Sequence, residues 1–146
     1  MGNPVHATCI EIDGMAVLLR GPPGSGKSDL ALRLIDSGAR LIADDYTDLG
    51  ISKGHLIARA PENIRGLIEV RGIGVLNVGS PVQATVGVVI DLVHVDEIER
   101  LPEAATTVLM DQALPLFKLS SFQSSTAAKI RLIVRQIKGE IDDANR

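Results

Sequence analysis

The sequence predicts a strand-rich α/β domain with one helix near the beginning of the chain and another near its end. Many short apolar or β-branched runs predict strands, whereas apolar residues recur at helical spacing in only two segments, residues 29–35 and 127–137. Between an apolar run and the first of these segments stands the motif G-x-x-x-x-G-K-S, which is typical of a strand–loop–helix unit. The scarcity of helices argues against a regular alternation of strands and helices.

Turn and cap residues predict how the first half of the chain is divided. Asp13-Gly14 is a strong signal for a hairpin turn, and Gly38 is expected to end the first helix as its C-cap. Gly50 and Gly54 are expected at turns of a short hairpin over residues 46–60. The other strands expected in this half are residues 5–12, 15–19, 39–43 and 67–71.

The second half is expected to add the central strand and the last helix. Residues 85–93 are the most β-branched run, which favours a strand in the middle of a sheet. Residues 106–110 and 114–119 predict two further short strands. The last helix is expected to begin after Ser124-Ser125 and to bury one broad apolar face that extends to Ile137.

The composition indicates a globular domain and excludes several partners. The 146 residues correspond to one domain, expected to span residues 1–146, and 45% of them are apolar. The net charge of −3 and the near absence of aromatic residues (2%) argue against nucleic acid as a partner. No apolar run approaches membrane-spanning length and the N-terminus lacks an export pattern, so no membrane partner and a cytoplasmic location are expected. Cys9, the single cysteine, is expected to be buried.

The segment from Gly21 to Ser28 points most directly to chemistry. Glycines allow the backbone to fold tightly, so that its N–H groups and the helix N-terminus face phosphate oxygens. Lys27 is expected to reach the β- and γ-phosphates of a nucleoside triphosphate, and the Ser28 hydroxyl to bind Mg²⁺. The residues predicted to hold the nucleotide are Gly21, Pro22, Pro23, Gly24, Ser25, Gly26, Lys27 and Ser28.

Phosphoryl transfer also needs a base, a metal ligand and a cation for the charge that develops. Asp44 and Asp45 end a predicted strand, where they could supply a metal contact and a general base; a solvated turn is the other interpretation. Glu69 lies within a predicted strand, where a buried carboxylate needs a metal ion or an ionic partner such as Arg71. Taken alone, the isolated His6 favours a structural role.

Several segments beyond the glycine-rich loop form a recognisable set, with His6 upstream of them. They are residues 30–38, residues 40–45 and the run Ile68-Glu69-Val70-Arg71-Gly72-Ile73-Gly74-Val75-Leu76-Asn77-Val78. Together they resemble the catalytic domain of bacterial HPr kinase/phosphorylase, for which the last run is close to diagnostic. The resemblance extends from about Val5 to Ile137. It implies a fold related to phosphoenolpyruvate carboxykinase, in agreement with the strand-rich prediction.

The resemblance also implies a reaction. Members of the family use ATP and Mg²⁺ to phosphorylate a serine of HPr, the small phosphocarrier of the sugar phosphotransferase system. They reverse this step with inorganic phosphate and release pyrophosphate. The corresponding residues here would be Asp45 as general base, Lys27 on the transferred phosphoryl group, Ser28 and Glu69 on Mg²⁺, His6 near the phosphates and Arg100 as the catalytic arginine.

The chain departs from the usual pattern of the family in three places. No large N-terminal domain is expected before the catalytic domain, and the interval between Glu69 and Arg100 is shortened. Residues 119–125 stand where the family carries a loop tied to the reverse reaction. These features resemble the short form found in α-proteobacteria, and they leave the reverse reaction and the family's homo-hexamer open. Residues 112–126 are a candidate docking segment for the partner protein.

Two other functions stay open at this point. A small-molecule kinase would need a lid with several basic residues, whereas the candidate arginines are scattered along the chain at Arg59, Arg65, Arg71 and Arg100. A non-catalytic nucleotide sensor would not need the residues of phosphoryl transfer, yet the chain carries Lys27, Ser28, Asp45 and Glu69.

Overall fold

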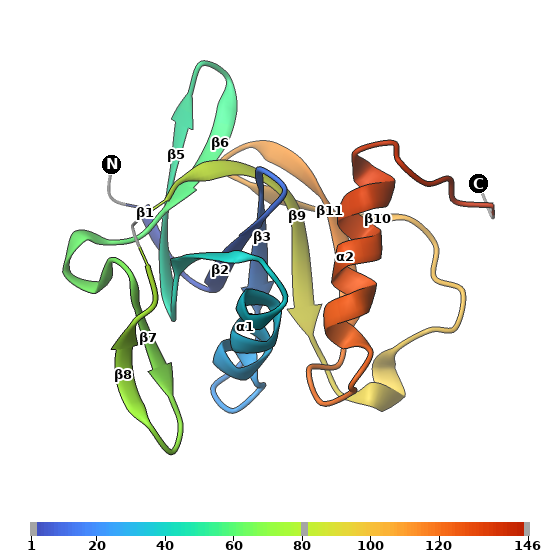
Figure 1. The fold of residues 1–146 in the computed structure, drawn as a ribbon. Coiled ribbons are helices and arrows are strands. Elements are labelled where there is room, and N and C mark those ends of the chain that lie inside the picture. The colour runs from blue at the N-terminus through green and yellow to red at the C-terminus, as the bar shows by residue number, and fades with distance from the viewer. Residues whose placement is uncertain (1–2, 80–81, 145–146) are drawn as a thin grey trace.

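The computed structural model describes residues 3–79 and 82–144, which form a strand-rich α/β fold (Figure 1). The α-helices are α1 (Lys27–Asp36) and α2 (Thr126–Ile137), and short 3₁₀ helices occur at η1 (Glu62–Ile64) and η2 (Val95–Glu97). The strands are β1 (Asn3–His6), β2 (Thr8–Ile12), β3 (Met15–Arg20), β4 (Arg40–Ala43), β5 (Tyr46–Ser52), β6 (His55–Arg59), β7 (Leu67–Val70), β8 (Gly74–Asn77), β9 (Ala84–Leu92), β10 (Ala105–Leu109) and β11 (Gln112–Leu119).

Nine of the described strands form one mixed sheet, in which seven follow the order β1-β5-β6-β9-β3-β2-β4 and the other two, β11 and β10, branch from β9. One edge of β9 pairs with the parallel strand β3, and its other edge pairs with β6 near its beginning and with β11 near its end. β10 continues the sheet beyond β11, whereas β7 and β8 form a separate two-stranded sheet. The prediction of a central strand over residues 85–93 is therefore confirmed, because β9 has neighbours along both edges.

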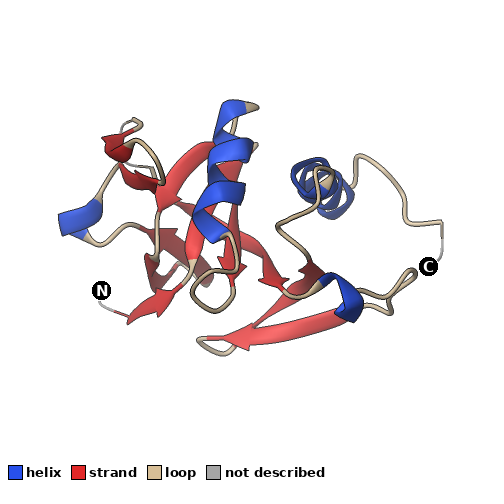
Figure 2. Cartoon of the chain, turned by 90° about the horizontal axis from the view of Figure 1, so that it is seen from below, coloured by secondary structure: helices blue, strands red, loops and turns tan. Residues whose placement is uncertain are grey.

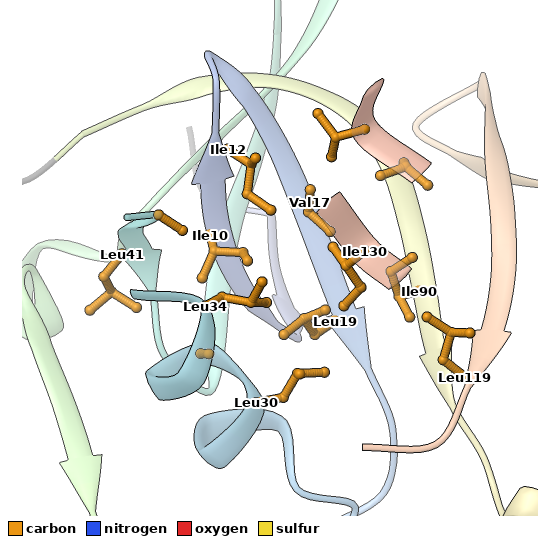
Figure 3. Packing of buried hydrophobic residues seen from close by; sticks show 14 of the residues in the cluster. Ile10, Ile12, Val17, Leu19, Leu30, Leu34, Leu41, Ile90, Leu119 and Ile130 are labelled. Atoms are coloured by element: carbon orange, nitrogen blue, oxygen red, sulfur yellow. The ribbon is translucent and has the colours of Figure 1, made fainter. Parts of the chain in front are cut away.

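Both α-helices cover the same side of the main sheet, as Figure 2 shows. Leu30 and Leu34 of α1 pack with Ile130 of α2 against residues of β2, β3 and β9 (Figure 3). Alternate residues of β3 belong to two different clusters, since Val17 faces the helices and Leu18 faces the opposite side. A strand buried on both faces must be apolar throughout, which explains the run before the glycine-rich loop. The core thus fixes β3 and α1, the two elements that carry this loop.

The ends of α1 follow from its glycines. Gly26 precedes the helix with φ of +87°, a left-handed conformation that glycine adopts without strain. The C-cap is Ser37 rather than Gly38 as predicted; Gly38 lies one position beyond it with φ of +112° and donates its N–H to the Ile35 carbonyl at 3.0 Å, so the glycine still ends the helix. Among the described residues, neither α1 nor α2 nor any other helix is long and apolar enough to cross a membrane.

Two predictions about the strands were wrong, and pairing explains both. Residues 5–12 form two strands because the chain bends at Ala7, whose N–H donates to the Val5 carbonyl at 3.0 Å; β1 then pairs with β5, and β2 with β3 and β4. Gly50 lies inside β5 opposite Ile57 rather than at a turn. The hairpin turns at Lys53-Gly54, where φ is +52° and +79°, the two positive values that a tight two-residue turn requires.

Candidate functional site

The glycine-rich loop connects β3 to α1 and fits tightly against its surroundings. A Cβ atom on Gly21 would lie 2.5 Å from Ser25 Oγ, and one on Gly26 would overlap the Ser121 side chain. Ser25 Oγ is buried and has no hydrogen-bond partner within the described parts of the chain. A buried hydroxyl in a loop at a helix N-terminus has the chemistry to receive a phosphate oxygen. The loop therefore fits the phosphate groups of a nucleotide.

Lys27 lies over this loop as the first residue of α1. It is 7% exposed, and its Nζ donates to the carbonyls of Gly21 at 2.7 Å and Pro22 at 3.3 Å. These bonds keep a charged group satisfied although it is nearly buried. An ammonium has three N–H donors, so a phosphate oxygen can share the group with the loop carbonyls.

Asp44 is the centre of the hydrogen-bond network beside the loop. The side chain follows β4 and is 7% exposed. Its Oδ1 accepts hydrogen bonds from Ser28 Oγ at 2.7 Å and Thr8 Oγ1 at 3.2 Å, and its Oδ2 accepts one from the Glu69 N–H at 3.2 Å. A buried carboxylate with three donors belongs to the structure of the site, so the interpretation of this residue as part of a solvated turn is wrong.

Thr8 is a site residue that the sequence analysis missed. It is fully buried on β2, where its hydroxyl donates to Asp44 and accepts from the Asp45 N–H at 3.2 Å. One hydroxyl thus ties together the side chain of the first aspartate and the backbone of the second. The signal in the sequence was a polar residue next to Cys9 in an apolar strand, but its partners lie more than 35 residues away and are found only through strand pairing.

Asp45 points outward from the same corner of the site. Its φ is +68°, and the Tyr46 N–H donates across it to the Asp44 carbonyl at 2.7 Å, which defines a three-residue turn. Turns of this kind with positive φ are strained, and such strain is concentrated at functional sites. The Asp45 side chain is 61% exposed, and its Oδ1 lies 2.8 Å from His6 Nε2. Since a carboxylate only accepts, the Nε2 of His6 carries the proton.

The His6 ring is held from a second side by Tyr46. The two ring centroids are 5.2 Å apart and the ring planes are inclined by 35°. Tyr46 did not figure among the residues that the sequence indicated. Its position next to Asp45 places an aromatic side chain directly against the imidazole, so His6 is oriented by both a hydrogen bond and a ring contact.

Glu69 joins the site through its backbone. On β7 the side chains of Ile68 and Val70 are buried, whereas that of Glu69 is exposed. The expectation that a buried carboxylate here needs a metal or Arg71 therefore does not apply, because water solvates the group. Within the described residues no three His, Cys, Asp or Glu side chains gather around one point that could hold a metal ion. The role of Glu69 as a magnesium ligand stays a prediction.

The structure brings most of the predicted residues to one end of the sheet, and Arg100 makes none of the contacts that join them. Arg100 lies in the exposed loop between η2 and β10. Within the described parts of the chain, no hydrogen bond or ion pair joins it to the other candidate residues. Those that lie together are His6, Lys27, Ser28, Asp44, Asp45 and Glu69.

A cleft of about 590 Å³ opens beside the glycine-rich loop. One wall is the loop itself, from Pro22 to Ser25, and the others are the segment that follows β9 and residues of the loop before α2. In Figure 1 these three segments meet at the lower end of the molecule. Because β4 and β9 lie on opposite sides of β3, Asp44 and the cleft flank the loop from opposite sides.

Comparisons with known proteins agree with this arrangement. A family model described as "HPr Serine kinase C-terminal domain" matches residues 2–130. HPr kinase/phosphorylase of Lactobacillus acidophilus is 47% identical over 78 residues, and that of Clostridium botulinum is 43% identical over 74 residues. These alignments cover 52% and 51% of this chain, and the chain spans about a quarter (24%) of the length of each relative.

A solved structure extends the likeness over nearly the whole chain. The Hpr(Ser) kinase/phosphatase from Coxiella burnetii superposes with a TM-score of 0.83 at 29% sequence identity, over 95% of this chain and 92% of that one. The likeness confirms the predicted fold, a strand-rich α/β domain with a mixed sheet and a C-terminal helix. The family match covers most of the sequence, including the glycine-rich loop and both aspartates. The chain therefore belongs to the family of HPr serine kinase C-terminal domains.

Proposed function

We propose that this domain transfers the γ-phosphoryl group of ATP to a serine hydroxyl of an HPr-like phosphocarrier protein. The observation that carries the proposal is the pair of adjacent aspartates with separate environments. Asp44 is buried against Ser28, whereas Asp45 is exposed and held by His6. These two environments support a division of roles that phosphoryl transfer needs, with Asp44 acting beside the glycine-rich loop and Asp45 acting on an incoming substrate.

In the proposed reaction the serine oxygen attacks the γ-phosphorus, ADP leaves, and the serine proton passes to Asp45. With Asp45 Oδ1 engaged by His6, the second carboxylate oxygen is the acceptor. The strained backbone of Asp45 and its bond to Thr8 hold this group in a fixed direction. In the reverse reaction the protonated Asp45 would return the proton to the serine oxygen as inorganic phosphate takes the phosphoryl group.

The residues around Ser28 fit Mg²⁺. The Ser28 hydroxyl donates its hydrogen to Asp44, so its oxygen lone pairs can face a cation, and oxygen ligands are those that Mg²⁺ prefers. When bound, Mg²⁺ would neutralise charge on the phosphates. Ser28 and Asp44 would hold it, Glu69 is a further candidate, and Lys27 would bind the phosphoryl oxygens.

The decisive experiment measures label transfer from γ-labelled ATP to a purified HPr-like protein in the presence of Mg²⁺. Asp45→Asn is expected to abolish transfer while ATP binding stays within about twofold of the wild type. Lys27→Ala is expected to weaken binding and transfer together. Adding inorganic phosphate after labelling tests the reverse reaction, which would release the label as pyrophosphate.

Asp111→Asn is the matched control for Asp45→Asn. Asp111 is also an exposed aspartate in a left-handed conformation, with φ of +63°, but it lies in the turn between β10 and β11. The control variant is expected to retain wild-type transfer. Full transfer by Asp45→Asn would show that this carboxylate is not the base.

The resemblance also implies a homo-oligomer that works in the cytoplasm. The mass of the protein in solution tests whether it is an oligomer.

A further inference from the structure

Phe122 is an exposed aromatic side chain at the edge of the glycine-rich loop. It is 78% exposed, the highest value among the exposed large apolar residues of the described chain. Its ring nevertheless lies against the N-terminus of α1, because a Cβ atom on Gly26 would be 3.5 Å from Phe122 Cε1. The ring lines the cleft together with Pro22 and Leu92. An exposed apolar ring thus lies where the glycine-rich loop joins the N-terminus of α1.

The loop that carries Phe122 is fixed on both sides of this residue. The Ser121 hydroxyl donates to the Ser25 carbonyl, and the Arg33 guanidinium donates to the carbonyls of Ser121 and Gln123, the latter at 3.2 Å. Arg33 belongs to α1, so the helix that begins at the nucleotide loop also holds the loop of Phe122. An aromatic ring on a fixed backbone loses little conformational entropy when a ligand covers it.

The walls of the cleft beside the ring are mainly apolar, and several polar side chains there are already engaged. Ser120 Oγ accepts the N–H of Phe122 at 3.3 Å, and Gln123 Oε1 accepts from Lys129 Nζ at 3.1 Å. His94 Nδ1 accepts a hydrogen bond within η2. These bonds engage the Ser120 hydroxyl oxygen, the Gln123 amide oxygen and His94 Nδ1. The cleft is therefore better suited to a flat apolar face than to a strongly polar group.

We propose that Phe122 is the platform on which the base of the nucleotide stacks, with the cleft as the nucleoside site. This inference rests on the proposed function to the extent that a nucleotide occupies the loop. Asp44 and Ser28 place the phosphoryl-transfer end on the β4 side of β3, so the nucleoside extends toward the other side, where the cleft lies. Every base has an aromatic face, and stacking on a protein ring is tolerant of base identity.

The test compares binding of ATP with binding of inorganic tripolyphosphate, which carries the phosphates without a base. Phe122→Ala is expected to weaken ATP binding by about tenfold to a hundredfold, the usual effect of removing a stacking ring, and to leave tripolyphosphate binding unchanged. Phe122→Tyr keeps the ring and is expected to restore the affinity for ATP. ATP and GTP are expected to bind within about threefold of each other, because stacking dominates.

Val108→Ala is the control, since Val108 is also an exposed apolar residue (63%) but lies on β10. Equal ATP affinity of Phe122→Ala and the wild type would overturn the proposal. A loss confined to transfer onto the HPr-like protein, with ATP affinity unchanged, would also overturn it and assign the ring to the protein substrate. Failure of the proposed function is a different result: wild-type protein would bind ATP in a ring-dependent manner without labelling the acceptor.

Discussion

Replacing Thr8 with valine is expected to reduce the free energy of unfolding and the rate of phosphoryl transfer together. Valine fills nearly the same space as threonine, so the change removes the hydroxyl without opening a cavity. The Thr8 hydroxyl makes two hydrogen bonds, one to the Asp44 carboxylate and one from the Asp45 N–H, both at 3.2 Å. Asp44 would keep its bonds to Ser28 and Glu69.

The size of the effect follows from the charge of the partners. A hydrogen bond to a charged group contributes about 1.5 to 3 kcal/mol, and one between neutral groups about 0.5 to 1.5 kcal/mol. Loss of both bonds to Thr8 should therefore lower the free energy of unfolding by about 2 to 4 kcal/mol, out of a total of about 5 to 15 kcal/mol for a domain. Because the Asp45 backbone loses an anchor, transfer should slow by about tenfold or more.

Thr47→Val provides the matched control, measured by urea unfolding and by the label-transfer assay. Thr47 is fully buried like Thr8, but its hydroxyl makes one hydrogen bond, to the Ala7 carbonyl at 2.8 Å. That variant should lose about 1 kcal/mol of stability and keep its transfer rate. The reasoning would be refuted if Thr8→Val and Thr47→Val lost the same stability and transferred at the same rate.

Three further predictions concern the surroundings of individual residues. Gly26→Ala should lower the free energy of unfolding and the ATP affinity more than Gly14→Ala does. Both glycines have a positive φ (+87° and +85°), but only a Cβ atom at Gly26 would clash with a neighbouring loop. Equal effects of the two substitutions on unfolding and binding would argue against this clash. Burial raises the pKa of the Cys9 thiol, so its alkylation at pH 8 should be much slower in the folded than in the unfolded protein; labelling at equal rates would contradict this. Burial alone raises the pKa of Glu11, but hydrogen bonds from Arg40 and the Gly14 N–H hold it below its usual value. The stability lost in Glu11→Gln should be greatest at neutral pH, begin to shrink as the pH falls below about 4.3, the usual pKa of glutamate, and vanish only below the lowered pKa of Glu11 in the folded protein; a difference independent of pH would contradict it.

Features of the fold that depend on neighbouring residues were predictable from the sequence. The glycine-rich loop, the helix after it and the turn at Asp13-Gly14 are encoded by residues within a few positions of one another. The β-branched run of β9 also sufficed to identify a central strand. For the candidate site, the same local signals pointed to Lys27 and Ser28, and Asp44 and Asp45 stood out because they end a strand; their roles stay predictions.

The features that were missed depend on contacts between distant segments. The break at Ala7 arises because β1 and β2 find different partners, and nothing in residues 5–12 alone specifies β5 as one of them. Thr8 becomes part of the site only because β2 pairs with β4, which brings it beside Asp44. The exposure of Phe122 is set by the anchoring of its loop to α1 through Arg33, a contact that spans about ninety positions (88 and 90). Patterns of apolar residues carry no information on such pairings.

The two sides of β3 divide the proposed work of the domain. On the β4 side, buried hydrogen bonds join Thr8, Ser28 and Asp44, so a change in one partner alters the position of the others. On the β9 side, the cleft is held by contacts to backbone carbonyls, which do not depend on the identity of the side chain that points into it. Substitution of Phe122 can therefore change nucleotide affinity without disturbing the carboxylates, whereas substitution of Thr8 cannot spare Asp45. Nucleotide binding and phosphoryl transfer should accordingly respond to different sets of mutations, although residues of α1 take part in both.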